Sequence, residues 1–393
     1  MNSFKVLQIA MFVVLNFFSL IHSSEKECSC SPSRDSSSSV SIFPDAAGNS
    51  ETIAQNLGDF GTISPPRMAE DSFENMVMIP AGHYKIGTSR PRIVLDGEGP
   101  RREVQINSFF LDKFEVSNQA FALFVNETGY ESESHKYGWS FVFHSAIPPA
   151  IKRTIKHSVS GAEWWLPVNG ATWREPEGPG SDVLAKDSYR GHLPAVHISW
   201  NDAVAYCSWR NARLPTEAEW ETGARGGNEL LPYPWGKTLE SMEQDNRTEI
   251  VFSQSQPAES GAQATSTEKN KKWKRHRANI FHGKFPGHNT ADDGFEFLAP
   301  VDAFGPQNAL GLYNMIGNAW EWVSDDWSVA HSVERYGLSS GAEAGHPDNP
   351  EKTKKGGSFL CHKSYCHRYR TAARHHSTAD SATSNSGFRC AHD

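Results

Sequence analysis

The chain has 393 residues, with 38 lysines and arginines against 46 aspartates and glutamates, so its formal net charge is −8. This balance excludes a general nucleic-acid binder, because contacts to phosphates require a basic surface. The 31 glycines, 22 prolines and 12 tryptophans indicate irregular backbone with frequent turns, in place of long helices or large sheets.

Residues 1–24 have the pattern of a signal peptide. Lys5 precedes an apolar run from Val6 to Ile21, and two serines follow it. The run is short and interrupted, so we expect a cleaved signal and no membrane span after cleavage; an uncleaved anchor is the alternative. In the secretory pathway cysteines oxidise by default, and Asn126-Glu-Thr and Asn246-Arg-Thr become candidate glycosylation sites.

Residues 25–72 are rich in serine, glycine and alanine, which predicts a flexible N-terminal extension. Dense aromatic and turn signals begin at Phe73, so we expect one folded domain over residues 73–393. Its first segment, Met76–Gly87, predicts two short strands joined by a turn. A second polar stretch, at about 237–277, predicts a solvated surface insertion instead of a site for polyanions.

Two helices are predicted near the middle of the chain. In Asp202–Arg210 the apolar side chains fall on one face, as in an amphipathic helix. Thr216 and Glu219 have the spacing of a capping box, with a further helix after them. We expect both helices to serve the core, with Cys207 buried or bridged.

The residues with the richest chemistry lie in a glycine-led, histidine-rich loop, Gly356–Arg370. Cys361 and Cys366 in this loop could form a local disulfide, act as a redox pair, or bind a soft ion such as Cu(I) through two thiolates. We expect Lys363, Arg368 and His362 to favour the thiolate form electrostatically. Zinc is disfavoured because the Cys-x-x-Cys spacing of common zinc modules is absent.

Several blocks of the sequence resemble the formylglycine-generating enzymes, the sulfatase-modifying oxidases of the secretory pathway. The resemblance extends from about Met76 to Cys390, and the Cys-His-x-Ser-Tyr-Cys loop is its most specific part. The other blocks are Phe110–Asn118, Trp164–Val168, His197–Cys207, Arg213–Glu221, Gly311–Trp322 and Ser386–Cys390.

This resemblance implies a single α+β domain of the C-type-lectin-like kind, poor in regular secondary structure. It also implies an enzyme of the endoplasmic reticulum lumen that uses O2 to oxidise a cysteine to Cα-formylglycine. The substrates implied are nascent or unfolded sulfatases with a Cys-x-Pro-x-Arg segment. By the same match Cys361 and Cys366 hold Cu(I), and the site is lined by Ser358, His362, Trp320 and Tyr365.

Two structural calcium sites follow from the resemblance, although the residues alone would read as ordinary polar turns. Hard cations prefer carboxylate, amide and carbonyl oxygens. The first site would use the side chains of Asn279 and Asp293 with the carbonyls of Ile280 and Phe295. The second would use the side chains of Asn314 and Glu321 with the carbonyls of Gly317 and Ala319.

The resemblance also implies a role for each of the remaining cysteines. Cys207 and Cys390 match a family disulfide, while Cys28 and Cys30 match a pair in the extension linked to retention and efficient action in the cell. As exposed thiols, Cys28 and Cys30 would be prone to mixed disulfides with partners. Cys30-Ser31-Pro32-Ser33-Arg34 itself has the substrate form, by chance or as a segment that visits the chain's own active site.

The peptide groove of the family corresponds here to Trp139, Ser140, Phe141 and Asn385. Where relatives carry an acidic partner for the substrate arginine, this sequence has Trp139, so a cation-π contact would replace the ion pair.

Three other functions are weighed against the oxidase. A non-catalytic paralogue that binds sulfatases and regulates their modification would lack the two active-site cysteines. A lectin-like binding module would not explain the paired thiols. An iron-dependent ergothioneine sulfoxide synthase would need a histidine triad on an additional helical domain.

Overall fold

The computed structural model describes residues 32, 75–186, 188–239, 276–331 and 351–393. Outside the described residues lie the predicted signal peptide and most of the 237–277 insertion, including Asn246. The N-terminal extension, with Cys28 and Cys30, also lies outside them, apart from Pro32. No helix among the described residues is long and apolar enough to cross a membrane.

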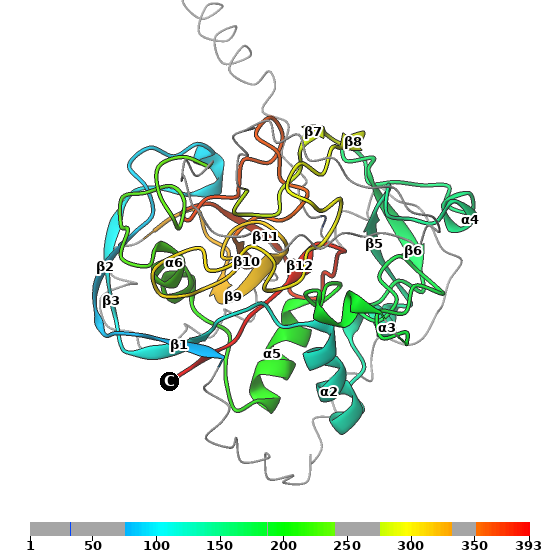
Figure 1. Cartoon of the computed structure of the whole chain (residues 1–393), viewed down its shortest axis with the longest axis horizontal. Coiled ribbons are helices and arrows are strands. Elements are labelled where there is room, and N and C mark those ends of the chain that lie inside the picture. The colour runs from blue at the N-terminus through cyan, green and yellow to red at the C-terminus, as the bar shows by residue number, and fades with distance from the viewer. Residues whose placement is uncertain (1–31, 33–74, 187, 240–275, 332–350) are drawn as a thin grey trace, which may run out of the picture. The chain divides into compact units, whose positions relative to one another are not determined.

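Short helices and strands are joined by irregular segments throughout (Figure 1), as predicted for an α+β domain with little regular structure. The described helices are α2 (Asn118–Thr128), α3 (Glu133–Tyr137), α4 (Pro149–Lys152), α5 (Trp200–Trp209) and α6 (Glu217–Arg225), with 3-10 turns at Val94–Asp96 and Tyr189–His192. The described strands are β1 (Met76–Ile79), β2 (Gly82–Ile86), β3 (Arg102–Ile106), β4 (Phe109–Asp112), β5 (Trp139–Phe143), β6 (Trp165–Asn169), β7 (Gly283–Lys284), β8 (His288–Asn289), β9 (Trp320–Asp326), β10 (Glu351–Lys355), β11 (Arg374–Thr378), β12 (Ser386–Gly387) and β13 (Ala391–His392).

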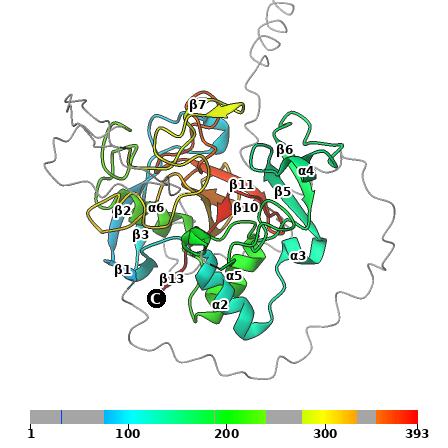
Figure 2. The ribbon, with the colours of Figure 1, turned by 45° about the vertical axis from the view of Figure 1, so that its right-hand side comes forward.

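A four-stranded sheet in the order β11-β10-β9-β12 occupies the centre (Figures 1 and 2). The pairs β9–β10 and β10–β11 are antiparallel, whereas β12 runs parallel to β9. The cysteine loop connects β10 to β11, so both ends of the loop are anchored in the central sheet. Gly356 opens the loop with a φ of 91°, and a Cβ there would lie 3.0 Å from the carbonyl oxygen of Met315. Only glycine fits this turn without strain.

Smaller sheets surround the central one. The two strands predicted in Met76–Gly87 are present as β1 and β2, but they pair with different partners. β1 pairs with β4, which also pairs with β13, and β2 pairs with β3. β5 and β6 form a separate antiparallel ribbon, with α3 and α4 nearby (Figure 2).

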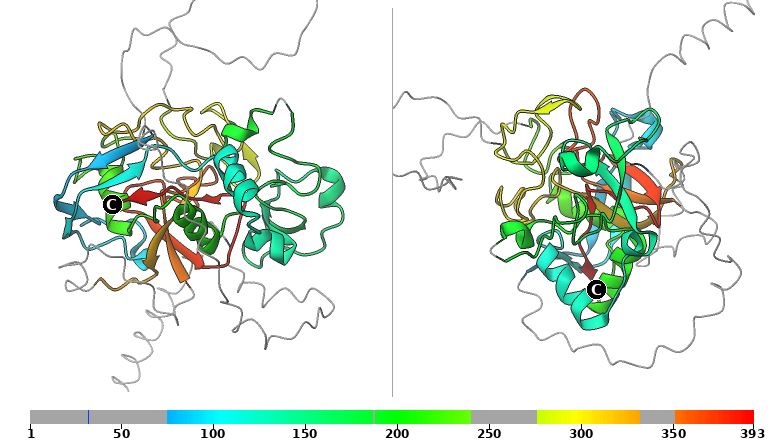
Figure 3. Two further views of the ribbon diagram at one scale, coloured as in Figure 1. Left: turned by 90° about the horizontal axis from the view of Figure 1, so that it is seen from below. Right: turned by 90° about the vertical axis from the view of Figure 1, so that its right-hand side faces the viewer.

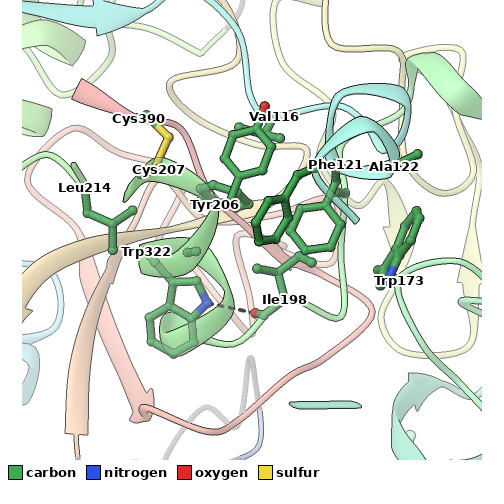
Figure 4. Close-up of a cluster of buried hydrophobic side chains, with 14 of the residues drawn as sticks. Val116, Phe121, Ala122, Trp173, Ile198, Tyr206, Cys207, Leu214, Trp322 and Cys390 are labelled. Atoms are coloured by element: carbon green, nitrogen blue, oxygen red, sulfur yellow. Dashed lines mark hydrogen bonds between the residues drawn. A yellow bond between two sulfur atoms is a disulfide. The ribbon is translucent and has the colours of Figure 1, made fainter. Parts of the chain in front are cut away.

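Helices α2 and α5 lie side by side below the central sheet (Figures 1 and 3). α5 begins two residues before the predicted start, because Ser199 caps it and forms a capping box with Asp202. The aromatic rings of Phe121 and Tyr206 stack between the two helices with centroids 5.7 Å apart (Figure 4). The structure joins Cys207 of α5 to Cys390, as the resemblance implied.

Helix α6 carries charged residues yet is buried along its whole length. Its predicted capping box between Thr216 and Glu219 is present. Glu217 and Glu221 face β10 and β11, where Lys355 Nζ lies 3.2 Å from a Glu217 oxygen and 2.9 Å from a Glu221 oxygen. Arg374 forms a bidentate pair with Glu217, at 2.7 Å for each bond. We refer to Glu217, Glu221, Arg225, Lys355 and Arg374 as the α6 ion network.

The α6 ion network is stable because its charges compensate each other. Burial raises the pKa of the Glu221 carboxyl, but Lys355 and Arg225 outweigh this effect and lower the pKa to about 2. Arg374 and Lys355 likewise hold the pKa of Glu217 well below its ordinary value against the effect of burial. Both carboxylates therefore remain charged at neutral pH, and loss of either partner would leave buried, uncompensated cations.

Replacing Glu221 by glutamine tests this network. At pH 7 we expect Glu221→Gln to be less stable than the unmodified protein by about 3 kcal/mol or more, because Lys355 and Arg225 lose a buried partner. A group with a depressed pKa contributes stability above its unfolded pKa, and this contribution is lost as the pH falls. The difference in urea midpoint between Glu221→Gln and the unmodified protein should therefore narrow as the pH falls from about 4.5 to about 2.

The control is Glu127→Gln, on the exposed side of α2, which should match the unmodified protein at every pH. A Glu221→Gln deficit that stays constant down to pH 2 would contradict the assignment of a low pKa to this carboxyl.

Candidate active site

The two cysteines of the loop lie together. A tight turn, in which the amides of Tyr365 and Cys366 both donate to the carbonyl of His362, brings the sulfur of Cys366 to 2.7 Å from that of Cys361. A disulfide bond is about 2.05 Å long, and Cys361 is a buried free thiol. The two sulfurs are therefore not bonded to each other, which argues against the local disulfide; Cys366 is itself disulfide-bonded to a partner other than Cys361.

Burial controls the ionisation of Cys361. It raises the pKa of the thiol to about 11, against the lowering effects of Ser358 and Arg368. Arg368 is itself paired with Asp96, at 2.6 and 2.9 Å, and Lys363 is exposed. Arg368 thus favours the thiolate electrostatically, as expected, but desolvation outweighs its charge and keeps the pKa raised.

Ser358 supplies hydrogen bonds to this sulfur. Its amide nitrogen lies 3.4 Å from Sγ of Cys361, and both its amide and its hydroxyl lower the pKa of this thiol, as donors to a sulfur do. The hydroxyl oxygen accepts from Nδ2 of Asn385 at 3.0 Å and from the amide of Leu360 at 3.3 Å. Because both lone pairs of the oxygen are occupied, its proton is left for the sulfur. Asn385, predicted to bind substrate, thus lies directly behind Ser358.

Two further predicted residues carry unused donors. The indole nitrogen of Trp320 and the hydroxyl of Tyr365 are buried and have no hydrogen-bond partner among the described residues. Burial raises the pKa of Tyr365, so it remains a protonated donor. Its ring stacks on Phe285, with centroids 4.3 Å apart, and meets the edge of Trp164 at 4.8 Å. These aromatic contacts fix the position of Tyr365.

His362 lies on the outer side of the loop, where its Nδ1 is 2.6 Å from the hydroxyl of Ser364. Partial burial and the charge of Lys363 lower its pKa, so the ring is neutral at neutral pH.

The predicted peptide groove lies on β5, and its residues differ in exposure. Ser140 is fully buried: its hydroxyl donates to the carbonyl of Ala382 at 2.7 Å and lies 2.8 Å from Nδ1 of His197. The Ser140 side chain therefore supports β5 from inside, and its contact with a bound peptide stays a prediction. Trp139 is half-buried and packs edge-on against Phe141, with centroids 5.0 Å apart.

The first predicted calcium site has the expected residues in place. The carboxylate of Asp293 accepts from the amides of Ile280, at 2.9 Å, and Phe295, at 3.1 Å, which brings both backbone segments to it. Oδ1 of Asn279 is buried without a hydrogen-bond partner. A buried, unpaired amide oxygen is costly unless something positive binds it, so the donor set fits a cation.

The second predicted calcium site also contains an unpaired oxygen, Oδ1 of Asn314. The carboxylate of Glu321, however, is already bonded to Arg389 and to the indole nitrogen of Trp220, each at 2.7 Å. Glu115, which was not predicted, is a buried carboxylate 2.8 Å from Nδ2 of Asn314. Burial and the neighbouring Glu321 raise the pKa of Glu115. The sequence indicated the burial of Glu115 by placing this charged residue between two apolar residues, Phe114 and Val116.

Among the described residues, no three histidine, cysteine, aspartate or glutamate side chains gather in a way that could hold a metal ion. The candidate soft-metal site thus consists of two sulfurs.

Asn126, a predicted glycosylation site, is exposed on α2.

Comparison with known proteins decides the family. The sulfatase-modifying factor enzyme 1-like domain matches residues 62–393. The chain belongs to this family. It is 47% identical over 333 residues to the formylglycine-generating enzyme of Mus musculus, covering 85% of this chain and 78% of that protein. It is 43% identical over 335 residues to the one of Thermomonospora curvata, covering 84% and 97%.

Relatives of the family also include a protein named as inactive. The chain is 39% identical over 319 residues to inactive Cα-formylglycine-generating enzyme 2 of Bos taurus, covering 81% of this chain and 87% of that protein. Among solved structures, PvdO from Pseudomonas aeruginosa has a TM-score of 0.51 at 20% identity, covering 81% and 94%, which shows a shared fold. The predicted family, fold and class of enzyme, an oxidase that makes formylglycine, are thus confirmed.

Proposed function

We propose that the chain uses Cu(I) and O2 to oxidise the cysteine of a Cys-x-Pro-x-Arg segment in unfolded sulfatases to Cα-formylglycine, in the lumen of the endoplasmic reticulum. The observation that carries this proposal is the pair of buried sulfurs of Cys361 and Cys366, 2.7 Å apart, with the unused hydroxyl donor of Tyr365 on the residue next to Cys366. The sulfatase-modifying relatives supply the substrate class.

The sulfur pair fits copper by its chemistry. Thiolates are soft ligands that select Cu(I), and the buried position of both sulfurs excludes harder, hydrated ions. Both thiols must be free to hold the ion, so the disulfide of Cys366 has to be reduced first. Binding must also displace the proton of Cys361, whose thiol has a pKa of about 11. When bound, copper supplies the one-electron chemistry that O2 requires.

The described residues give the reaction its geometry. The unused N–H of Trp320 and O–H of Tyr365 would donate to an oxygen species at this site. Ser358 stabilises the sulfur of Cys361 with two donors. Removal of two electrons and two protons from the substrate leaves a thioaldehyde, and an external dithiol supplies two more electrons so that O2 ends as two waters. Water then releases sulfide and leaves the aldehyde.

Trp139 is proposed to receive the arginine of the substrate. It lies at the start of β5 with part of its ring exposed, and its edge-on contact with Phe141 fixes the orientation of the ring. A guanidinium over an indole face is attracted by the ring without the need for a carboxylate.

The oxidase is tested with a Cys-x-Pro-Ser-Arg peptide, the reduced and copper-loaded protein, O2 and a dithiol. We expect the peptide to lose about 18 Da, as sulfur is replaced by a carbonyl oxygen. A peptide with serine in place of cysteine is the control, and Cys361→Ser and Cys366→Ser should each abolish the reaction. Copper binding without any loss of mass would reject the oxidase and favour the alternative, a non-catalytic regulator that binds sulfatases.

Two structural Ca2+ ions are proposed at the buried, unpaired oxygens of Asn279 and Asn314. Calcium at about 100 times its dissociation constant should stabilise each site by about 2.7 kcal/mol, which raises the melting temperature by roughly 5 °C per site. Asn279→Ala and Asn314→Ala should each remove about half of this response. Asn228→Ala, whose amide bonds only to a nearby carbonyl in a surface turn, should keep all of it. A calcium response that both variants retain would contradict the assignment.

The segment Cys30-Ser31-Pro32-Ser33-Arg34 is proposed as a substrate of this chain or as a pseudosubstrate. The basis is its Cys-x-Pro-x-Arg form; within it the structure describes only Pro32, which is buried. Mass spectrometry of the mature protein should find formylglycine at residue 30, or deletion of residues 25–40 should lower the KM for the peptide. Cys30 found only as a thiol or disulfide, with an unchanged KM on deletion, would reject both forms of the proposal.

A further inference from the structure

Lys354 is a buried lysine at the end of β10 that no carboxylate balances in any described contact. It is 0% exposed, and its Nζ lies 2.8 Å from the hydroxyl of Ser377, 3.5 Å from that of Ser386 and 4.8 Å from the ring centroid of Trp322. Burial without an anionic partner is costly for lysine and lowers its pKa well below the ordinary value. The neighbouring Lys355, by contrast, is paired with two glutamates.

A continuous line of hydrogen bonds leads from this lysine to the active site. Nζ of Lys354 reaches Ser386, whose hydroxyl is 2.8 Å from that of Thr383. Thr383 donates to Oδ1 of Asn385 at 2.8 Å, and Nδ2 of the same amide donates to the hydroxyl of Ser358 at 3.0 Å. All five side chains are buried. We call this line the Lys354 chain.

The direction of these bonds follows from the protons that each group carries. Thr383 gives its single hydroxyl proton to Asn385, so the proton between Thr383 and Ser386 must come from Ser386. Ser386 can then only accept from Lys354. At the far end the Ser358 hydroxyl accepts from Asn385, so its own hydrogen remains available for the sulfur of Cys361. Every bond therefore points from the lysine to the active site.

We propose that Lys354 is a positioning residue. As the donor at the head of this chain, it keeps the side-chain amide of Asn385 oriented with Nδ2 toward Ser358, so that the Ser358 hydroxyl donates its hydrogen bond to the sulfur of Cys361. Without that donor the side-chain amide of Asn385 can rotate by about 180° and exchange the places of its oxygen and nitrogen. Ser358 then donates to Oδ1 of Asn385 instead of to the sulfur. The sulfur loses one of its two donors, while Cys361 and Cys366 keep their places. The side chain of Asn385, although predicted to bind substrate, is buried behind Ser358. The effect on turnover rests on the proposed oxidase function; the effect on the Asn385 amide does not.

Lys354→Met and Thr383→Val test the chain at two points. Methionine fills the space of lysine with an apolar side chain in an apolar interior, and valine matches the shape of threonine, so both variants should fold. We expect kcat to fall about tenfold in each, roughly the value of one hydrogen bond, with KM unchanged. The double variant should also fall about tenfold, because both changes break the same chain.

Ser377→Ala is the matched control. It removes the other hydroxyl that Lys354 contacts but leaves every bond toward Ser358 in place, so kcat should stay within about twofold of the unmodified value. A general packing defect around the lysine would lower the activity of this variant as well.

A measurement without copper or substrate separates the proposal from the oxidase function. In protein labelled with nitrogen-15 asparagine, the side-chain NH2 signals of Asn385, assigned by their loss in Asn385→Asp, should shift in Lys354→Met and Thr383→Val and stay in place in Ser377→Ala. Unchanged Asn385 signals, or a double variant that loses about a hundredfold in kcat, would overturn the proposal. A peptide left unoxidised by the unmodified protein, with the signals shifted as expected, would reject only the oxidase function.

Discussion

The buried pairing between α6 and the central sheet is the constraint on which the active site depends. Lys355 is the last residue of β10, and it is tied to Glu217 and Glu221 just before the chain turns into the cysteine loop. Arg374, the first residue of β11, is tied to Glu217 where the chain returns to the sheet. Both ends of the loop are therefore fixed by the same short helix, and each charge is stable only while its partners remain in place.

This arrangement explains how a chain with so little regular structure can place two sulfurs together. The loop has no ladder of its own. Its shape comes from a glycine turn, from the bond between Ser358 and Asn385, and from the stack of Tyr365 on Phe285. The same burial that orders the loop raises the pKa of Cys361, so burial favours the thiol form of this side chain over the thiolate.

Local signals predicted local structure well. The capping boxes of α5 and α6 and the cysteine loop were readable because each depends on residues within a few positions of one another. The pairing of β1 and β2 with other strands was not, since it depends on contacts distant in the sequence. The lowering effect of Arg368 on the pKa of Cys361 was predicted, but the larger, opposing effect of burial was not, because charges are visible in a sequence whereas depth of burial is not. The inward direction of Ser140 and the role of Glu115 depend on tertiary packing in the same way.

The order of the strands has a consequence for how the protein matures. Asn385 stands behind Ser358, β12 completes the central sheet, and Cys390 closes the bridge to α5, and all three follow the cysteine loop in the chain. When the loop leaves the ribosome, the residues that support it have therefore not yet been made. The two sulfurs can reach their final positions only after residues 385–390 have joined the fold.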